Sequence, residues 1–191
     1  QKIKSSWVFC NRERTREEVL VQDALEQKLW SIGQEMIYSR GKMLYYTQDL
    51  PFPVTHCPDV FSTFRKEVER IVPVREPIPR PRDHFNPRSI TVEEGDLPSL
   101  NDFGINDFET DERAAIEFEG GETAALKRLK YYLWETDLVK DYFNSRNGMI
   151  GEDYSTKFSP WLAQGCLSPK MILRASVFKG EKQAGGERRR V

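Results

Sequence analysis

The sequence contains few of the residues that build metal centres, disulfide frameworks or histidine-based catalytic sites. Its 191 residues include three cysteines (Cys10, Cys57 and Cys166) and two histidines (His56 and His84). The cysteines are far apart and lack C-x-x-C spacing, so neither a disulfide framework nor a zinc site is expected. With only two histidines, we expect no histidine-based catalysis and no bound metal.

The sequence also lacks a strong net charge and a long hydrophobic run. The formal net charge is −1, with 31% charged and 38% hydrophobic residues. A nearly neutral chain has no overall attraction to nucleic acid or to anionic membranes, so contact with DNA would need a local basic patch. No run of 18 apolar residues is present, which argues against a membrane span. The first residues, QKIKSSWVFC, show neither a signal peptide nor an initiator Met, so we expect the sequence to start inside a longer protein.

The first part of the chain alternates a strand, a helix and a second strand, which is typical of a parallel sheet. The apolar run at residues 7–10 (WVFC) predicts a buried strand, and residues 35–38 predict the next one. Between them, Thr15 and Glu18 have the spacing of a capping box, in which each side chain bonds a free backbone amide.

Two helices are predicted in the same region. The first follows the capping box and is ended by Gly33; its apolar positions are Val21, Leu25, Leu29 and Ile32. The second is amphipathic and covers residues 59–71. A single strand–helix–strand unit cannot cover its own sheet, so residues 1–72 predict an incomplete α/β domain.

The rest of the chain divides into a connector and a helical region. Six of the eleven prolines lie between positions 73 and 98, and an acidic stretch follows, which indicates a long connector over residues 73–117. Helical spacing then returns over residues 118–178. A helix at residues 122–135 is predicted to bury Ala125, Leu129, Tyr132 and Leu133 and to keep Lys127, Arg128 and Lys130 off that face. Thr136 is placed to cap a second helix, whose apolar face is Leu138, Val139, Tyr142 and Phe143.

The stretch from Tyr154 to Pro169, YSTKFSPWLAQGCLSP, holds two Ser-Pro pairs that predict two helix starts separated by Gly165. The N–H groups and the positive dipole end of the first helix would favour an anion. Hydroxyl donors and one positive charge lie beside it, at Ser155, Thr156, Lys157 and Ser159, and phosphate is the anion that suits them. The alternative is that both Ser-Pro pairs only cap their helices.

Three segments in this order, GGETAALKRLKYYL, a Tyr142-x-x-x-Arg146 pair and YSTKFSPWLAQGCLSP, resemble the start of the flavin-binding region of the photolyase/cryptochrome family. The segments VFCNRE, LYYTQDLPF, PDVFSTFRKEVE and STKFSPWLA resemble the cryptochrome DASH branch most closely, and the resemblance runs from about Val8 to Arg174. It implies a fold of α/β plus all-α class: part of a Rossmann-like antenna domain, the long connector, and the first helices of the domain that holds FAD. Beyond Arg174 the glycines and charges predict a disordered tail over residues 179–191.

The resemblance implies roles for particular residues. Tyr142 would lie beside the adenosine-phosphate arm of FAD, and five consecutive residues would grip its pyrophosphate: Ser155, Thr156, Lys157, Phe158 and Ser159. Arg146 resembles an arginine that contacts the DNA backbone; the alternative is a last-turn arginine stabilised by the helix dipole. Glu17 resembles a carboxylate that contacts a 5,10-methenyltetrahydrofolate antenna; the alternative is a first-turn acid stabilised by the same dipole. The four tryptophans are expected to be mostly core, and none is assigned to electron transfer.

For the intact protein, the resemblance implies a blue-light-dependent lyase. Electron transfer from reduced flavin would split cyclobutane pyrimidine dimers in single-stranded DNA, where the dimer is already unstacked. One alternative is a photoreceptor that binds DNA, RNA or protein without repair, and another is an inactive truncated product. Catalytic residues are not identified in this sequence. We expect a monomer with no membrane contact, in the chloroplast or mitochondrion for a plant-type member and in the nucleus or cytoplasm otherwise.

Overall fold

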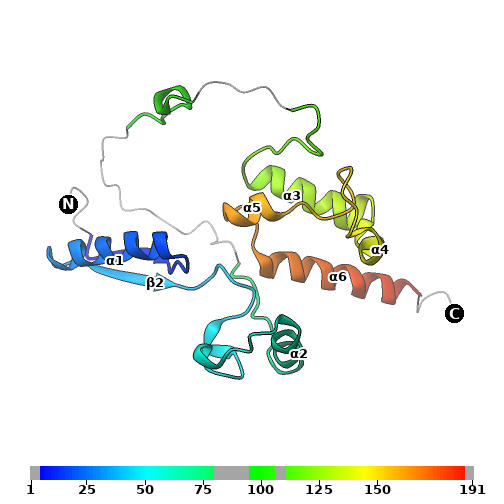
Figure 1. The fold of residues 1–191 in the computed structure, drawn as a ribbon, viewed down its shortest axis with the longest axis horizontal. Helices are drawn as coiled ribbons and strands as arrows, with labels where there is room; N and C mark the ends of the chain where they lie inside the picture. Colours follow the sequence, from blue (N-terminus) through cyan, green and yellow to red (C-terminus); the bar gives the residue numbers. More distant parts are fainter. Residues whose placement is uncertain (1–4, 80–94, 106–110, 188–191) are drawn as a thin grey trace. The chain divides into compact units, whose positions relative to one another are not determined.

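The computed structural model describes residues 5–79, 95–105 and 111–187, which form two compact units (Figure 1). The first unit comprises Gln1–Pro73 and Ile78–Phe103, and the second comprises Val74–Pro77 and Gly104–Val191. The connector predicted at residues 73–117 lies partly outside the described residues. Its described part contains one short 3₁₀ turn, η3 (Asn101–Phe103). Within the described ranges, no helix has the length and apolar character needed to cross a membrane.

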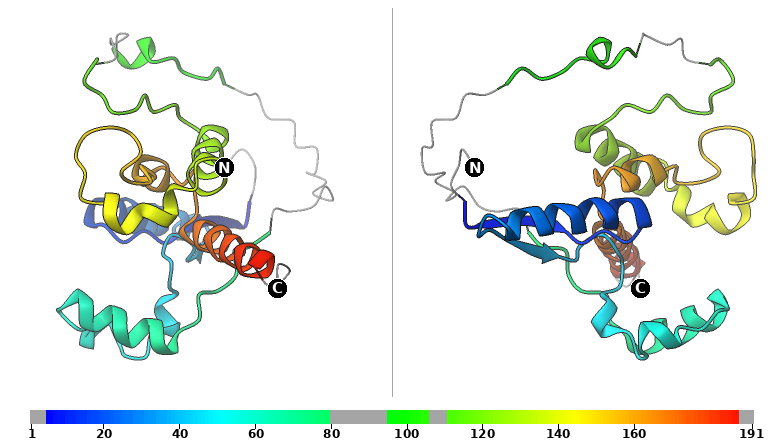
Figure 2. Two further views of the ribbon diagram at one scale, coloured as in Figure 1. Left: turned by 90° about the vertical axis from the view of Figure 1, so that its right-hand side faces the viewer. Right: turned by 60° about the vertical axis from the view of Figure 1, so that its left-hand side comes forward.

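The first unit contains the predicted parallel sheet. Strands β1 (Trp7–Asn11) and β2 (Glu35–Ser39) pair in parallel, with Trp7 opposite Glu35. Helix α1 (Arg16–Trp30) connects them and lies along the strand pair in each view (Figures 1 and 2). The helix ends before Gly33, whose φ of +72° suits glycine. The predicted α/β class and the strand–helix–strand order are therefore confirmed.

The start of α1 differs from the predicted capping box. The Thr15 side chain makes no hydrogen bond to the backbone; its hydroxyl donates to the Glu18 carboxylate. A charged acceptor makes a stronger hydrogen bond than a neutral one, which favours this arrangement. The bond from Thr15 also lowers the pKa of Glu18. The two side chains therefore bond each other, and the predicted exchange with backbone amides is wrong.

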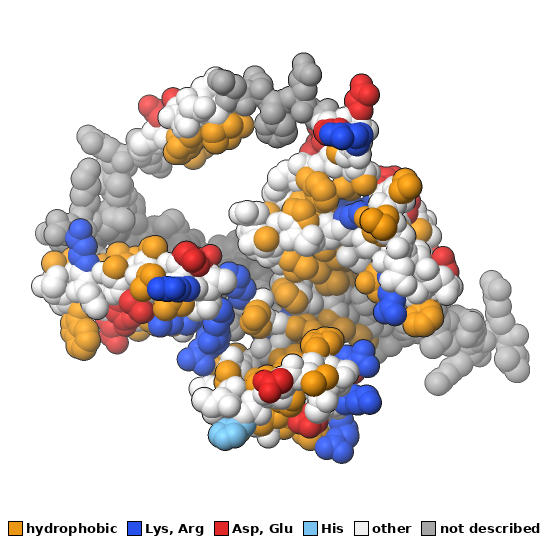
Figure 3. Space-filling view, in the orientation of Figure 1, with side chains coloured by type: hydrophobic (Ala, Val, Ile, Leu, Met, Phe, Trp, Pro, Cys, Tyr) orange, Lys and Arg blue, Asp and Glu red, His pale blue; other side chains and the backbone are white. Residues whose placement is uncertain are grey.

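Helix α2 (Phe61–Ile71) confirms the second predicted helix within two residues. It follows two 3₁₀ turns, η1 (Thr47–Asp49) and η2 (Val54–His56). Val68 is fully buried, and the ring of Phe64 lies 5.8 Å from that of Phe52 in the preceding loop. The other apolar positions of the helix, Val60, Phe61 and Ile71, are exposed because little of this unit packs on α2. Figure 3 shows such hydrophobic side chains at the surface.

The second unit is helical. It contains α3 (Glu122–Lys130), the π-helical turn η4 (Tyr131–Glu135), η5 (Leu138–Asp141), α4 (Tyr142–Ser145), α5 (Ser159–Ala163) and α6 (Pro169–Glu187). The predicted apolar face of the helix at residues 122–135 is buried in one core with residues of the stretch 154–169. The core consists of Ala125, Leu129, Tyr132, Leu133, Phe158, Trp161 and Leu167. The predicted helical region is confirmed around this core.

Two details of the second helix were predicted wrongly. The hydroxyl of Thr136 donates to the carbonyl of Tyr131 (2.8 Å), so this residue closes the preceding turn and does not cap the next helix. Of the predicted apolar face, Leu138 and Val139 in η5 pack against the core, while Tyr142 and Phe143 in the four-residue helix α4 are exposed.

The predicted tail and the predicted burial of tryptophan also need correction. Helix α6 continues through residues 179–187, and Lys179 is buried against Asp137, so the tail is helical there; residues 188–191 lie outside the described residues. Of the four tryptophans, only Trp161 is buried, while Trp7, Trp30 and Trp134 are exposed. A two-stranded sheet with one helix offers too little apolar surface to cover Trp7 and Trp30.

Candidate functional site

The predicted site residues of the second unit lie on α4, on α5 and on the loop that joins them. The loop is drawn back to α4 by two hydrogen bonds: the Gly148 N–H donates to the Ser145 carbonyl (2.8 Å), and the Ser145 hydroxyl donates to the Tyr154 carbonyl (3.2 Å). Gly148 allows a close approach, since a Cβ at this position would lie 2.9 Å from the Cβ of Tyr154. The structure thereby brings the end of α4 next to the segment that starts at Tyr154.

Residues 155–159 offer hydrogen-bond donors that the fold itself does not use. Within the described part of the chain, the hydroxyls of Ser155, Thr156 and Ser159 have no hydrogen-bond partner, and the backbone N–H groups of residues 155–159 donate to no other group. Lys157 has a φ of +59°, and Phe158 follows with φ −78° and ψ −12°. Such an alternation of left- and right-handed residues turns successive N–H groups toward one concave side, which suits an anion.

Lys157 and Phe158 contribute differently from the hydroxyl residues. The Lys157 ammonium donates to the Tyr154 hydroxyl and lies 3.7 Å from the centre of its ring, so the charge is held within the segment. Phe158 is buried in the core, where its ring meets that of Tyr132 edge to face at 6.1 Å. The side chain of Phe158 therefore anchors the segment in the core.

Helix α5 starts one residue earlier than the Ser-Pro pattern suggests. Ser159 is its first residue, Phe158 takes the cap position, and neither makes a side-chain capping bond. Ser159 was expected to be the cap, and this detail is wrong. With five residues, α5 has too short a dipole to hold an anion by itself. Its end is as predicted, since Gly165 has a φ of +73°. The buried Trp161 fixes the helix by donating its indole N–H to the Glu119 carbonyl (2.8 Å).

Arg128 is the residue of this region that the sequence prediction missed. It was expected off the apolar face of its helix, yet only 7% of it is exposed. Its guanidinium donates to the carbonyls of Glu152 (2.7 Å) and Thr156 (3.2 Å) and lies 3.5 Å from the Asp153 carboxylate. A signal was present, since position 128 lies three residues after Ala125 and four before Tyr132, on the same side of a helix.

Two tyrosines beside Arg128 complete the polar surroundings. The Tyr131 hydroxyl donates to Asp153 (3.0 Å), and this bond raises the pKa of Tyr131. The hydroxyl of the fully buried Tyr132 finds no partner among the described residues, and burial raises its pKa. The Asp153 carboxylate lies 3.5 Å from the Arg128 guanidinium, and this opposite charge lowers the repulsion between Asp153 and an anion bound nearby.

The other predicted site residues are exposed. Tyr142 lies at the start of α4, and the guanidinium of Arg146, just after the helix, lies 5.1 Å from the centre of the Phe143 ring. Glu17 is exposed in the first turn of α1, in the other unit. No group of three His, Cys, Asp or Glu side chains in the described residues could hold a metal.

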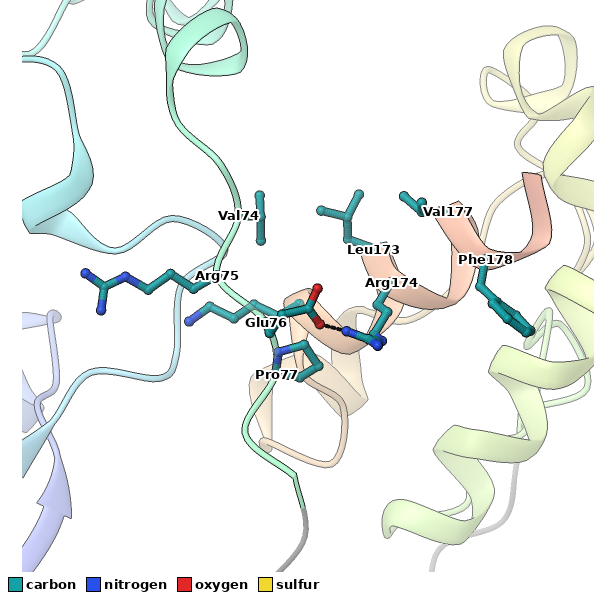
Figure 4. A pocket seen from close by; sticks show the side chains of 9 residues that line it. Val74, Arg75, Glu76, Pro77, Leu173, Arg174, Val177 and Phe178 are labelled. Atoms are coloured by element: carbon teal, nitrogen blue, oxygen red, sulfur yellow. Dashed lines mark ion pairs between the residues drawn. The ribbon is translucent and has the colours of Figure 1, made fainter. Parts of the chain in front are cut away.

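Two hollows lie in the second unit, apart from the 155–159 segment. One, of about 400 Å³, lies between residues 74–77 and α6, where Leu173, Val177 and Phe178 line it and Arg174 pairs with Glu76 (Figure 4). The other, of about 450 Å³, is lined by residues of α3 and η4, including Arg128, and by Trp161. Neither includes a residue predicted to bind a cofactor.

Comparison with known proteins gives consistent relatives, although no family model matches the chain. The chain is 44% identical over 179 residues to cryptochrome DASH of Xenopus laevis, which covers 93% of this chain and 34% of the relative. It is 41% identical over 169 residues to the Arabidopsis thaliana protein described as cryptochrome DASH, chloroplastic/mitochondrial, covering 86% of this chain and 29% of the relative. The crystal structure of the Synechocystis sp. PCC6803 cryptochrome matches with a TM-score of 0.81 and 36% identity, over 94% of this chain and 37% of that one. The chain thus spans about a third of the length of the relatives it matches.

Proposed function

Since this chain belongs to the photolyase/cryptochrome family, we propose that its residues 155–159 bind the pyrophosphate of FAD. The observation that carries the proposal is the row of unused donors: three hydroxyls and successive backbone N–H groups that make no bond within the described residues. Hydroxyl and backbone N–H donors fit a diphosphate, because a hydrogen bond to a charged oxygen is stronger than one to a neutral acceptor.

Each residue of the segment has its own part in this proposal. Ser155, Thr156 and Ser159 donate hydroxyl hydrogens, and the backbone around Lys157 turns the N–H groups to the same side. Phe158 holds the segment in the core. Tyr142 would border the adenosine end of the same ligand, and the hydrogen bond from Ser145 to the Tyr154 carbonyl, which ties α4 to the segment, supports this role.

The function of the intact protein that we propose is light-dependent repair of cyclobutane pyrimidine dimers in single-stranded DNA. The flavin would supply the electron that splits the dimer. In this chain, Arg146 would contact the DNA phosphates, supported by its stacking on the exposed Phe143. An exposed arginine stacked on an aromatic ring suits single-stranded DNA, because the guanidinium can contact phosphates and the ring can stack on bases. Glu17 would contact a folate antenna, and an organelle location would follow the Arabidopsis relative for a plant-type protein.

The FAD assignment can be tested with Ser155→Ala combined with Ser159→Ala. Each hydroxyl that bonds a charged oxygen contributes about 1.5–3 kcal/mol, so the loss of two should weaken FAD binding at least about a hundredfold. Quenching of flavin fluorescence on titration measures this affinity. The exposed Ser62→Ala in α2 is the matched control and should bind as the unaltered chain does. Equal affinity of the double variant would refute the phosphate role.

Repair itself needs a separate assay. Blue light on the full-length, flavin-loaded protein with a dimer in single-stranded DNA should restore intact pyrimidines, measured by loss of the dimer in chromatography. A full-length protein that holds FAD but leaves the dimer intact would contradict repair and favour the photoreceptor alternative.

A further inference from the structure

Arg128 carries a buried charge, and it has no part in the FAD-binding role proposed for residues 155–159. It lies in α3 between the exposed Lys127 and Lys130, yet its side chain is 7% exposed. An arginine is rarely buried unless partners satisfy its donors, because removing a charge from water is costly. Its partners therefore indicate what the burial achieves.

Among the described residues, the hydrogen-bond and ion-pair partners of Arg128 all lie in one short stretch, residues 152–156. The guanidinium donates to three backbone carbonyls, those of Glu152 (2.7 Å), Ser155 (3.4 Å) and Thr156 (3.2 Å). It also lies 3.5 Å from the carboxylate of Asp153. Five donors in a fixed planar fork can hold several carbonyls in one arrangement, which the single ammonium of a lysine cannot do.

Capture of these carbonyls also orients the backbone N–H groups. The carbonyl and the N–H of a planar trans peptide point in opposite directions. The Ser155 carbonyl shares a peptide with the Thr156 N–H, and the Thr156 carbonyl shares one with the Lys157 N–H. With both carbonyls turned to Arg128, both N–H groups point away from it. Both N–H groups are among the donors that make no bond within the described residues.

A second contact keeps the guanidinium in place. Its central carbon lies 5.1 Å from the centre of the Tyr131 ring, and the Tyr131 hydroxyl donates to Asp153 (3.0 Å). The ring, the carboxylate and the three carbonyls surround the charge. An anion on the far side of the segment would therefore meet oriented N–H groups rather than the guanidinium itself.

We propose that Arg128 is a positioning residue that presets the phosphate-binding backbone of residues 155–159 through its bonds to the carbonyls of Glu152, Ser155 and Thr156. The inference rests on the phosphate role proposed above. It predicts that the fork geometry of Arg128 is needed and that a positive charge alone is not sufficient.

The test uses the 191-residue chain with three variants: Arg128→Lys, which keeps the charge, Arg128→Gln, which removes it, and Lys127→Gln, the matched loss of an exposed neighbouring charge. Hydrogen exchange resolved by segment and titration with FAD are measured on each. Loss of charge-assisted bonds should speed exchange over residues 152–158 about tenfold and weaken FAD binding about tenfold in both Arg128 variants. Lys127→Gln should change neither.

Segment-resolved exchange separates positioning from a general loss of structure. A positioning role speeds exchange in residues 152–158 and leaves α3 and α6 protected; faster exchange throughout the second unit overturns it. Unchanged exchange in Arg128→Lys also overturns it, because the charge alone would then be sufficient. If Ser155→Ala with Ser159→Ala weakens FAD binding but neither Arg128 variant does, the inference falls and the proposed function stands. If the unaltered chain binds no FAD, or the serine variant binds it equally well, the proposed function falls and takes the inference with it.

Discussion

The loop that leads to the candidate site depends on one glycine, and replacing it is a sharp test of the geometry. In Gly148→Ala, the new Cβ would lie 2.9 Å from the Cβ of Tyr154 and 3.1 Å from the Ser145 carbonyl oxygen. Favourable contacts between carbon atoms lie at about 3.5–4.0 Å, so the loop must shift. Both neighbours belong to or adjoin the backbone and cannot rotate away. The φ of Gly148 is not among the positive ones, so the strain comes from space alone.

The change in the free energy of unfolding caused by Gly148→Ala follows from two opposing contributions. Forcing an extra methyl into an occupied space costs about 1–3 kcal/mol. Alanine also restricts the unfolded chain and thereby stabilises the fold by about 0.4–1 kcal/mol. The net expectation is a loss of about 1–2 kcal/mol in the free energy of unfolding of the second unit. Gly120→Ala is the matched control, because a Cβ there meets nothing within 4 Å. In this variant only the stabilisation that comes from restricting the unfolded chain should be seen.

The assay is urea unfolding of the two variants, followed by far-ultraviolet circular dichroism and by hydrogen exchange of the α3 amides, which reports on the second unit alone. FAD affinity is measured in parallel, since the loop joins Ser145 to Tyr154 just before the donor segment. We expect Gly148→Ala to unfold at lower urea concentration than Gly120→Ala and to bind FAD more weakly. Equal midpoints for the two variants would show that Gly148 is not in close contact with Tyr154, and the described loop path would then be wrong.

Two further predictions concern stability. Leu129→Ala should destabilise the second unit by about 2–5 kcal/mol, because it empties a buried position of the core. Leu126→Ala, on the exposed side of the same helix, should change the free energy of unfolding little. Similar urea midpoints for the two variants would contradict the assigned core. Hydrogen bonds from Lys140 and Lys179 lower the pKa of Asp137, so its stabilising effect is present above an ordinary carboxyl pKa of about 4 and is lost as the pH falls through the lowered value. Asp137→Asn should flatten this acid-side decline, and an unaltered slope between neutral and acidic pH would count against the pairing.

The elements of the fold were largely predictable from local patterns. Residues of one helical face recur every three or four positions, so the burial of Ala125, Leu129, Tyr132 and Leu133 follows from spacing alone. The strand–helix–strand order and the stop at Gly33 are equally local. Where the helix ends differ by one or two residues, the caps depend on which neighbour a hydroxyl meets, as with Thr15 and Thr136.

The sequence by itself determined which segments are helices and strands, because those depend on neighbours along the chain. The order of its motifs indicated the family. Only the tertiary structure decided what Arg128, Lys157 and Phe158 do. Arg128 meets carbonyls 24 to 28 residues away, a separation at which no periodicity acts. Lys157 turns to Tyr154, and Phe158 turns into the core, because packing decides which way each side chain of a loop points. The Lys157 and Phe158 side chains and the carbonyls bound by Arg128 have partners within the protein, whereas the hydroxyl and N–H donors of residues 155–159 have none among the described residues.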